Sequence, residues 1–348
     1  AKLVTQLYGD RMYIANATGC SSIWGGSSPS TPYTTNAQGE GPAWANSLFE
    51  DNAEYGYGMF LAQNTLRQDL ISKVEGVKET ADESAKAVID KFLDTKENSA
   101  ENKVAASELI EVLAKMNTPE ANEILKDKEY LSKKSVWIFG GDGWAYDIGF
   151  GGLDHVLASG EDVNVLVFDT EVYSNTGGQS SKSTPTGAIA KFAAAGKEVK
   201  KKDLAAIAMS YGYVYVAQVA QGADYNQCMK AFVEAGSYNG PSIVIAYAPC
   251  INHGIKGGMS IAQTEEKRAV QAGYWHLFRY DPRLVAEGKN GFQLDSKEPS
   301  ESYEQFIMNE VRYNSLARSN PERAKELFKK AEENAKKKYQ HLVELAQK

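Results

Sequence analysis

The sequence predicts an α/β fold, with a mostly parallel sheet flanked by helices, a helical insertion and a helical C-terminal tail. Apolar runs between residues 131 and 250 are nearly continuous, as in strands that are covered on both faces. Helical segments alternate with these runs, which is typical of parallel strands joined by right-handed crossovers. We expect the α/β domain to comprise residues 1–63 and 131–300, the insertion residues 64–130 and the tail residues 301–348.

The N-terminal elements follow from local composition. Residues 12–17 have the apolar content of a short strand, and residues 19–29 are typical of a Gly/Ser-rich loop with helix-start signals. Residues 31–45 lack apolar periodicity, and a loop of this length is usually functional or lies against a partner. Residues 64–130 differ, because Ala, Glu, Lys and Leu dominate and the apolar spacing predicts two to four amphipathic helices.

The later elements alternate more regularly. We predict strands at residues 135–139, 163–169, 211–217 and 242–248, with a short one at 276–279. Helices are predicted at residues 148–159, 202–210, 224–235 and 263–275, and a polar turn region at 289–299. The chain from residue 302 onward is helical, with a break where Pro321 suits the first position of a new helix.

The composition excludes several functional classes. The chain has 348 residues, 38 basic and 45 acidic, and a net charge of −7, so we expect no nucleic acid partner. No apolar run approaches the roughly 18–20 residues that span a bilayer, so we expect no membrane partner. Three cysteines argue against a disulfide framework and favour a cytoplasmic location.

The strongest chemical signal is Gly140-Gly141-Asp142-Gly143, which directly follows a predicted strand. Ligands of open parallel sheets bind beyond the carboxyl ends of the strands, where glycines let the backbone approach a phosphate. Asp142 puts a carboxylate beside that phosphate, and the two would repel unless a divalent cation lay between them. The motif thus predicts a metal-bridged diphosphate, although an Asp-Gly pair after a strand is also a common turn.

Thr170 is predicted to reach the same site. It follows Asp142 by 28 residues, a length that one helix and one returning strand bring back to the same sheet edge. Its hydroxyl and a nearby backbone carbonyl, that of Val172, are the hard oxygen ligands that Mg²⁺ prefers. The loop of residues 173–179 follows at once and supplies polar donors and glycines.

Two of the cysteines are candidates for the same edge. Cys20 and Cys250 both follow predicted strands, whereas Cys228 lies in a predicted helix, where we expect a packed thiol. For Cys20 and Cys250, a buried thiol and a functional group stay equally open on the sequence alone. The four histidines lack zinc-like spacing and are expected to be structural.

At these residues the sequence also resembles a known family. Gly-Asp-Gly, a spacer of this length and an Asn- or Thr-type ligand form the thiamin diphosphate motif. Longer runs are similar to one branch of that family, the pyruvate:ferredoxin (flavodoxin) oxidoreductases or pyruvate synthases, and the similarity covers essentially the whole chain. These runs are residues 15–25, 140–149, 169–179 and 247–252.

The resemblance implies the thiamin-diphosphate-binding fold and gives roles to the motif residues. Asp142, Thr170 and the Val172 carbonyl would hold Mg²⁺; Thr170 departs from the wider family, which has Asn there, but fits this branch. Asn175 would be the catalytic residue, with its amide near the substrate carboxylate or carbonyl. Contacts to thiamin diphosphate would come from Cys20, Gly141, Asp142, Gly143, Trp144, Thr170, Val172, Tyr173, Ser174 and Asn175.

The resemblance also implies a 4Fe–4S cluster beside the thiamin. Four thiolates hold such a cluster, and Cys20 and Cys250 would be two of them. The other two would come from an upstream Cys-x-x-Cys pair that this sequence does not contain, so we expect a fragment of a larger enzyme. The Glu that activates the aminopyrimidine generally comes from another domain in this family, so the fragment should be inactive alone.

The whole enzyme would convert pyruvate and coenzyme A to acetyl-CoA and carbon dioxide, passing electrons through iron–sulfur clusters to ferredoxin or flavodoxin. Its remaining domains, in a homodimer of the full enzyme, are the expected partners. One alternative is a non-redox thiamin diphosphate decarboxylase or synthase, in which Cys20 and Cys250 are plain core thiols. The other is a nucleotide-binding module that uses Gly140–Gly143 as a phosphate loop.

Overall fold

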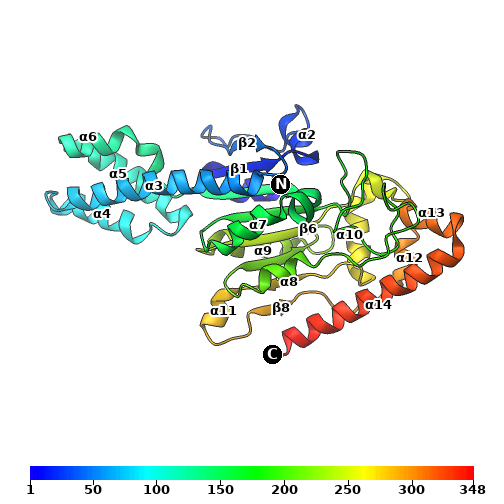
Figure 1. Ribbon diagram of the computed structural model, residues 1–348. Coiled ribbons are helices and arrows are strands. Elements are labelled where there is room, and N and C mark those ends of the chain that lie inside the picture. Colours follow the sequence, from blue (N-terminus) through cyan, green and yellow to red (C-terminus); the bar gives the residue numbers. More distant parts are fainter. The chain divides into compact units, whose positions relative to one another are not determined.

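Eight strands form one mixed sheet in the order β2-β1-β3-β4-β6-β5-β7-β8 (Figure 1). In its C-terminal part β4, β6 and β5 run parallel, while β7 and β8 are antiparallel additions at the edge. The predicted α/β class with a mostly parallel sheet is confirmed. The strands are β1 (Met12–Ala17), β2 (Ala43–Ser47), β3 (Ser135–Gly141), β4 (Asn164–Asp169), β5 (Tyr215–Val219), β6 (Ser242–Tyr247), β7 (Phe278–Tyr280) and β8 (Phe292–Leu294).

The computed structural model describes residues 1–348 as two units, each built from three stretches of the chain. The first, the helical unit, comprises Ala1–Ile14, Pro32–Ala45 and Tyr55–Trp137. The second, the α/β unit, comprises Ala15–Thr31, Asn46–Glu54 and Ile138–Lys348. The boundary passes within β1, β2 and β3, so each of these strands contributes residues to both units.

The α/β unit is built on strands that are apolar on both faces. In β4 every residue but Phe168 is buried, and in β5 every residue is buried, which the Val, Leu and Ala side chains of these strands favour. The register pairs Asn164 with Ser242 and Asp169 with Tyr247. The carboxyl ends of β4 and β6 therefore lie side by side, and the loops that follow them share one edge.

Helices cover this sheet and begin at polar caps. Asp203, Asp224 and Asn320 each accept a backbone N–H at the start of a helix, which satisfies donors that the first turn leaves without partners. The helices of this unit are α2 (Cys20–Gly26), α7 (Phe150–Ala158), α8 (Leu204–Met209), α9 (Tyr225–Ser237), α10 (Ala262–Gln271), α11 (Pro282–Ala286), α12 (Tyr303–Ile307), α13 (Val311–Ser319) and α14 (Pro321–Ala346).

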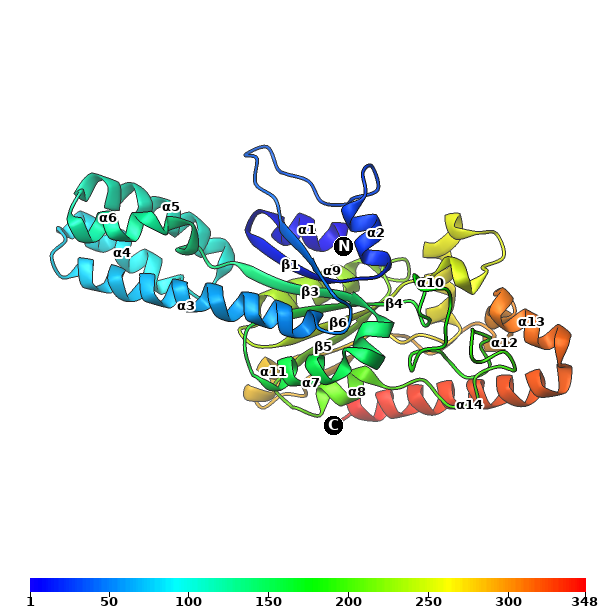
Figure 2. The same ribbon diagram turned by 45° about the horizontal axis from the view of Figure 1, so that its top comes forward.

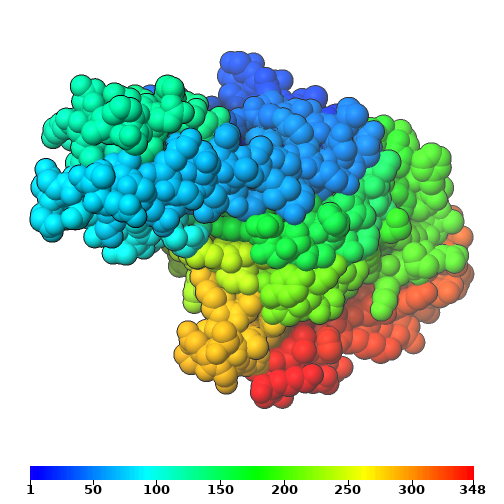
Figure 3. All heavy atoms as spheres, turned by 60° about the vertical axis from the view of Figure 1, so that its left-hand side comes forward, coloured from blue at the N-terminus to red at the C-terminus, as the bar shows by residue number.

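The long helix α14 runs along the α/β unit and passes α13 and α12 (Figure 2). Its C-terminal end lies beside the segment that contains α11 and β8, where the Asn290 amide donates to the Leu345 carbonyl (Figure 3). A helical tail from residue 302 is confirmed, including the new helix that begins at Pro321.

The helical unit owes its core to amphipathic spacing. Its helices are α1 (Lys2–Tyr8), α4 (Glu83–Asp94), α5 (Ser99–Met116), α6 (Pro119–Lys126) and most of α3 (Asn52–Lys78). Ile89, Phe92, Leu109 and Leu113 are fully buried in one apolar cluster of α3–α6. The Arg67 guanidinium is buried there and donates to the Leu131 and Lys96 carbonyls. Four helices therefore occupy the stretch in which two to four were predicted.

Some elements differ from the prediction for local reasons. Strand β5 begins at Tyr215 instead of residue 211, because Gly212 has φ +77° and interrupts the extended chain. Strands β2 and β8 were not predicted, since both are short and lie at the ends of the sheet. The predicted loop at residues 19–29 contains α2, and the helix predicted to start at residue 148 is preceded by a π-helical turn, Gly143–Ile148. No helix is long and apolar enough to cross a bilayer.

Candidate functional site

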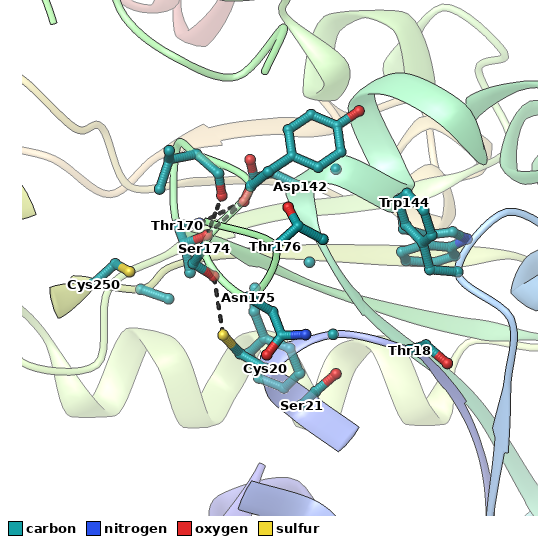
Figure 4. Close-up of a pocket in the computed structure, with 18 of the residues that line it drawn as sticks. Thr18, Cys20, Ser21, Asp142, Trp144, Thr170, Ser174, Asn175, Thr176 and Cys250 are labelled. Carbon is teal, nitrogen blue, oxygen red and sulfur yellow. Dashed lines mark hydrogen bonds between the residues drawn. The ribbon is translucent and has the colours of Figure 1, made fainter. Parts of the chain in front are cut away.

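A cavity of about 360 Å³ opens at the carboxyl edge of the α/β unit (Figure 4). Its walls come from five segments: the start of α2, the segment after β2, the turn after β3, the loop after β4 and the turn after β6. In an open parallel sheet this is the edge at which ligands bind, because the loops there are free to carry polar groups. All of its lining residues belong to the α/β unit.

Three oxygen-bearing groups meet in this cavity: the Asp142 carboxylate, the Thr170 hydroxyl and the Val172 carbonyl. The Thr170 hydroxyl donates to Asp142 Oδ1 at 2.6 Å, and its oxygen lies 3.0 Å from the Val172 carbonyl oxygen. The Thr170 backbone N–H also donates to Asp142 Oδ1, at 3.2 Å. The spacing of 28 residues thus returns Thr170 to Asp142, as the sequence predicts.

The Asp142 carboxylate is buried, with 1% of its surface exposed. Burial and the neighbouring Asp169 carboxylate raise the pKa of Asp142 to about 7. The Ser183 hydroxyl donates to its second oxygen at 2.8 Å. Burial, with the Asp169 charge, therefore disfavours the ionised carboxylate, and a nearby cation would stabilise it.

The loop after β4 is held in shape by its own backbone. Tyr173 donates its N–H to the Gln179 carbonyl, and Gly178 donates to the Tyr173 carbonyl. Glu171 adopts φ +59°, and the Thr184 hydroxyl donates to its carbonyl. These bonds keep the loop that carries Asn175 at the cavity wall.

Gly143 is needed for close packing next to Asp142. A Cβ atom at this position would lie 2.6 Å from the ring of Tyr173, which lines the same cavity. The Tyr173 ring also packs edge-on against Phe49, at 6.2 Å between centroids. The Gly-Asp-Gly motif thus lets the turn after β3 approach the loop after β4, and so brings Asp142 to Thr170.

Two of the three cysteines line the cavity. Cys20 is the first residue of α2, and its sulfur lies 3.1 Å from the Ser174 hydroxyl. Cys250 follows β6; burial raises the pKa of its thiol, and the Asn252 N–H points at its sulfur. Cys228 is buried in α9 away from the cavity, where burial raises the pKa of its thiol to about 12. The sequence expectation of a packed thiol at Cys228 agrees with this placement.

A buried network of His253, Glu310 and Arg312 contacts the backbone of Thr170. His253 Nε2 lies 2.7 Å from the Thr170 carbonyl oxygen, and its Nδ1 lies 3.7 Å from Glu310 Oε1. Burial, helped by the Arg312 charge, lowers the pKa of His253 to about 3, so the ring is neutral. Arg312 in turn donates to Glu310 at 2.6 Å and to Glu171 at 2.8 Å.

A second buried charge cluster lies under the loop. Lys201 Nζ is 2.7 Å from Asp169 and 3.0 Å from Glu171. Burial acts to raise the pKa of Glu171, but the Lys201 and Arg312 charges outweigh it and lower that pKa to about 2. Glu171 therefore stays ionised between two cations and fixes the loop beside Thr170.

The donor set fits Mg²⁺ rather than a softer metal. A carboxylate, a hydroxyl and a backbone carbonyl are hard ligands, and they leave room for oxygens from a diphosphate and water. No group of three or more His, Cys, Asp or Glu side chains forms a metal cluster anywhere in residues 1–348. Two thiols line the cavity, whereas a 4Fe–4S cluster takes four thiolates.

The structure brings every predicted site residue to this one cavity. They are Cys20, Gly141, Asp142, Gly143, Trp144, Thr170, Val172, Tyr173, Ser174, Asn175 and Cys250. Sequence reasoning missed Ser183, Glu310 and Arg312, because nothing in their local sequence places them near Asp142. From the sequence we expected His253 to be structural. Its position three residues after Cys250 could have indicated that it lies near the cavity.

The chain is similar to known families over most of its length. Residues 125–246 match the thiamine pyrophosphate enzyme family, in its C-terminal TPP binding domain. The chain is 58% identical to a pyruvate-flavodoxin oxidoreductase of Klebsiella pneumoniae, over 99% of this chain and 30% of that protein. It is 57% identical to a pyruvate:ferredoxin oxidoreductase of Moorella thermoacetica, again over 99% of this chain and 30% of that protein.

One further relative and one solved structure also match the chain. A mitochondrial pyruvate dehydrogenase [NADP(+)] of Euglena gracilis is 51% identical over 93% of this chain and 18% of that protein. A solved 2-oxoglutarate:ferredoxin oxidoreductase of Magnetococcus marinus matches with a TM-score of 0.42 and 15% identity, over 70% of this chain and 56% of that one. Such a distant match supports no argument about the site. The chain spans about 30% of the length of the first two relatives.

Proposed function

We propose that the chain is part of a pyruvate-flavodoxin or pyruvate:ferredoxin oxidoreductase, because it matches about 30% of the length of two such relatives, and that its cavity holds thiamin diphosphate and Mg²⁺. The observation that carries this proposal is the meeting of Asp142, Thr170 and the Val172 carbonyl at one cavity wall. These residues would bind Mg²⁺, and Gly141, Gly143, Trp144, Tyr173 and Ser174 would contact the cofactor.

The residues of this chain would mainly position and shield the reacting groups. When bound, thiamin diphosphate supplies a carbanion and an electron sink for 2-oxo acid decarboxylation. Asn175 lines the cavity on a loop fixed by backbone bonds, and its amide would orient the substrate carboxylate or carbonyl. Trp24, Phe49 and Phe168 supply apolar walls that exclude water from the reacting atoms.

Cys20 and Cys250 would hold two irons of a 4Fe–4S cluster beside the thiamin. Both thiols line the same cavity and both lie near Ser174. The remaining two thiolates would come from parts of the longer enzyme outside this chain. The whole enzyme would then oxidise pyruvate with coenzyme A and pass the electrons to ferredoxin or flavodoxin.

Calorimetric titration with thiamin diphosphate, with and without Mg²⁺, tests the metal–diphosphate site. It is made on this chain and on the full-length enzyme. We expect binding that needs Mg²⁺ and that Asp142→Asn weakens by at least about 100-fold, because the variant loses the one carboxylate ligand. Asp154→Asn is the control, since Asp154 lies on α7, bonds the Tyr211 hydroxyl and does not line the cavity.

Two results would contradict this proposal. One is binding of thiamin diphosphate that is equally strong without Mg²⁺ or in Asp142→Asn. The other is no binding to the folded full-length enzyme. Binding to the full-length enzyme alone would show that the other domains complete the diphosphate site.

A further inference from the structure

His253 lies between two segments that carry the cavity wall, the turn after β6 and the loop after β4. It ends a short 3₁₀ turn, Ile251–His253, which starts directly after Cys250. Its side chain is fully buried. A buried polar ring needs a partner for each of its two nitrogens, so the contacts of this ring show which parts of the site it holds together.

The ring bonds both segments at once. Nε2 lies 2.7 Å from the Thr170 carbonyl oxygen, and Nδ1 lies 3.4 Å from the Cys250 backbone nitrogen. A carbonyl oxygen can only accept a hydrogen bond, and a backbone N–H can only donate one. Nε2 therefore carries the proton and Nδ1 accepts, which defines one tautomer of the neutral ring.

The other groups around the ring are consistent with this tautomer. Glu310 Oε1 lies 3.7 Å from Nδ1, beyond hydrogen-bond distance, and has no hydrogen-bond partner. Tyr247 stacks on the imidazole at 6.3 Å between ring centroids, with 20° between the planes. Full burial and this stacking hold the ring in one orientation, so its two nitrogens do not exchange places.

The bond from Nε2 holds the peptide that joins Thr170 to Glu171. The carbonyl of this peptide accepts from His253, and its N–H donates to Asp169 Oδ1 at 3.2 Å. Glu171 then takes φ +59°, a left-handed conformation that residues other than Gly seldom adopt. The turn brings the Val172 carbonyl oxygen to 3.0 Å from the Thr170 hydroxyl oxygen. Fixing the peptide therefore fixes two of the three groups proposed to bind Mg²⁺.

The bond to Nδ1 holds the backbone of Cys250, whose thiol lines the cavity. The turn that follows is tight, because the Asn252 N–H points at the Cys250 sulfur and a Cβ atom at Gly254 would lie 2.5 Å from Val311. Thr170 and Cys250 lie on the same side of the cavity (Figure 4). One ring thus sets where the thiol lies relative to the oxygen-bearing groups.

We propose that His253 is a positioning residue that fixes the Cys250 thiol relative to the turn of residues 170–172, with one ring nitrogen assigned to each. The inference rests on the proposed function in one respect, since it takes this turn to be the one that binds Mg²⁺. Replacing a group that orients a metal ligand typically lowers metal affinity about 10- to 100-fold. The two bonds are separable, because an amide side chain can replace either nitrogen but not both.

His253→Gln and His253→Asn separate the two bonds. The Gln amide N–H reaches about as far as Nε2 and can still donate to Thr170, whereas the Asn oxygen takes the place of Nδ1 and can still accept from Cys250. Calorimetric titration of the full-length enzyme with thiamin diphosphate and Mg²⁺ measures the effect of the first bond. We expect His253→Asn to weaken binding about tenfold and His253→Gln less than about threefold.

Amide hydrogen exchange of the enzyme without cofactor measures the second bond. At the Cys250 amide, His253→Gln should speed exchange about tenfold because the N–H loses its acceptor, and His253→Asn should keep the parental rate. His276→Gln and His276→Asn are the matched controls, since His276 is also buried in the α/β unit and does not line the cavity. They should change neither measurement.

Nitrogen-15 spectra of the histidine-labelled chain test the tautomer without altering His253, and His276→Gln identifies the signal of the other buried ring. We expect His253 to be protonated at Nε2 alone. Three results would overturn the proposal: a His253 ring protonated at Nδ1, equal losses of cofactor binding in the Gln and Asn variants, or unchanged exchange at Cys250 in His253→Gln. A parent enzyme that binds no thiamin diphosphate would contradict the proposed function instead, and the exchange and the tautomer would still decide the role of His253.

Discussion

The two units bury different chemistry. The core cluster of the helical unit is apolar, and Arg67 is the one charged side chain of that unit that is fully buried. The α/β unit buries Asp142, Asp169, Glu171, Glu310 and Arg312. Burying charge costs free energy unless every group is paired. The helical core therefore serves stability, whereas the α/β unit spends free energy to bury charged groups near the cavity.

The cysteines allow the sharpest test of this contrast. In the full-length enzyme, Cys20→Ala and Cys250→Ala should each remove the electron paramagnetic resonance signal of the cluster nearest the thiamin, and reduce pyruvate-dependent reduction of ferredoxin or flavodoxin to background. Cys228→Ala, at a packed position in α9, should keep both. Full activity in the Cys250 variant would show that its thiol is only part of the core.

Arg312→Met should have the next largest effect. It leaves Glu171 and Glu310 buried without their shared partner, so we expect a loss of about 4 kcal/mol in unfolding free energy. Urea denaturation measures it. Arg318→Met, at an exposed position on the same helix, is the control and should change little. If Arg312→Met and Arg318→Met lower the unfolding free energy by the same amount, the buried network adds nothing to stability.

Phe92→Ala tests how much the apolar core of the helical unit contributes to stability. Phe92 is fully buried in the helical unit, and its removal should cost about 3 kcal/mol through the lost apolar contact and the cavity left behind. Leu66→Ala, at a residue that is 45% exposed on α3, should cost less than about 0.5 kcal/mol. Binding of thiamin diphosphate to folded Phe92→Ala should be unchanged, and a loss would link the helical core to the cofactor site.

The smallest effect is expected at Glu266, a buried carboxyl that does not line the cavity around Asp142. Burial raises its pKa from 4.5 to about 7, so the folded state holds this proton more tightly than the unfolded chain. Its contribution to stability is present below pH 4.5 and is lost as the pH rises through 7. Glu266→Gln should therefore be about 1–2 kcal/mol more stable than the parent at pH 8 and equal to it at pH 4.

Urea denaturation at the two pH values measures this difference. Glu333→Gln, at an exposed position on α14, should show none. If Glu266→Gln raises the unfolding free energy equally at both pH values, the titration of Glu266 is not the cause of the gain.

The sequence could predict the elements with a strong apolar pattern and the residues that one crossover brings together. Asp142 and Thr170 are 28 residues apart, and the geometry of strand, helix and strand fixes where both side chains arrive. Ser183 and Arg312 reach the site through an irregular loop and a distant helix, whose paths no local pattern encodes. The edge strands β2 and β8 were missed because sheet pairing, rather than intrinsic preference, makes so short a segment extended.

The long reach of Arg312 has a consequence for the order in which this protein matures. It lies 141 residues after Glu171, and the ligand-bearing loop leaves the ribosome well before the helix that neutralises it. Until α13 is made and docks, Glu171 lacks one of its two cations and His253 lacks its supporting carboxylate. The cavity is therefore completed from its C-terminal end, and a chain released early by truncation would carry Asp142, Thr170 and Val172 without the buried network that supports Thr170.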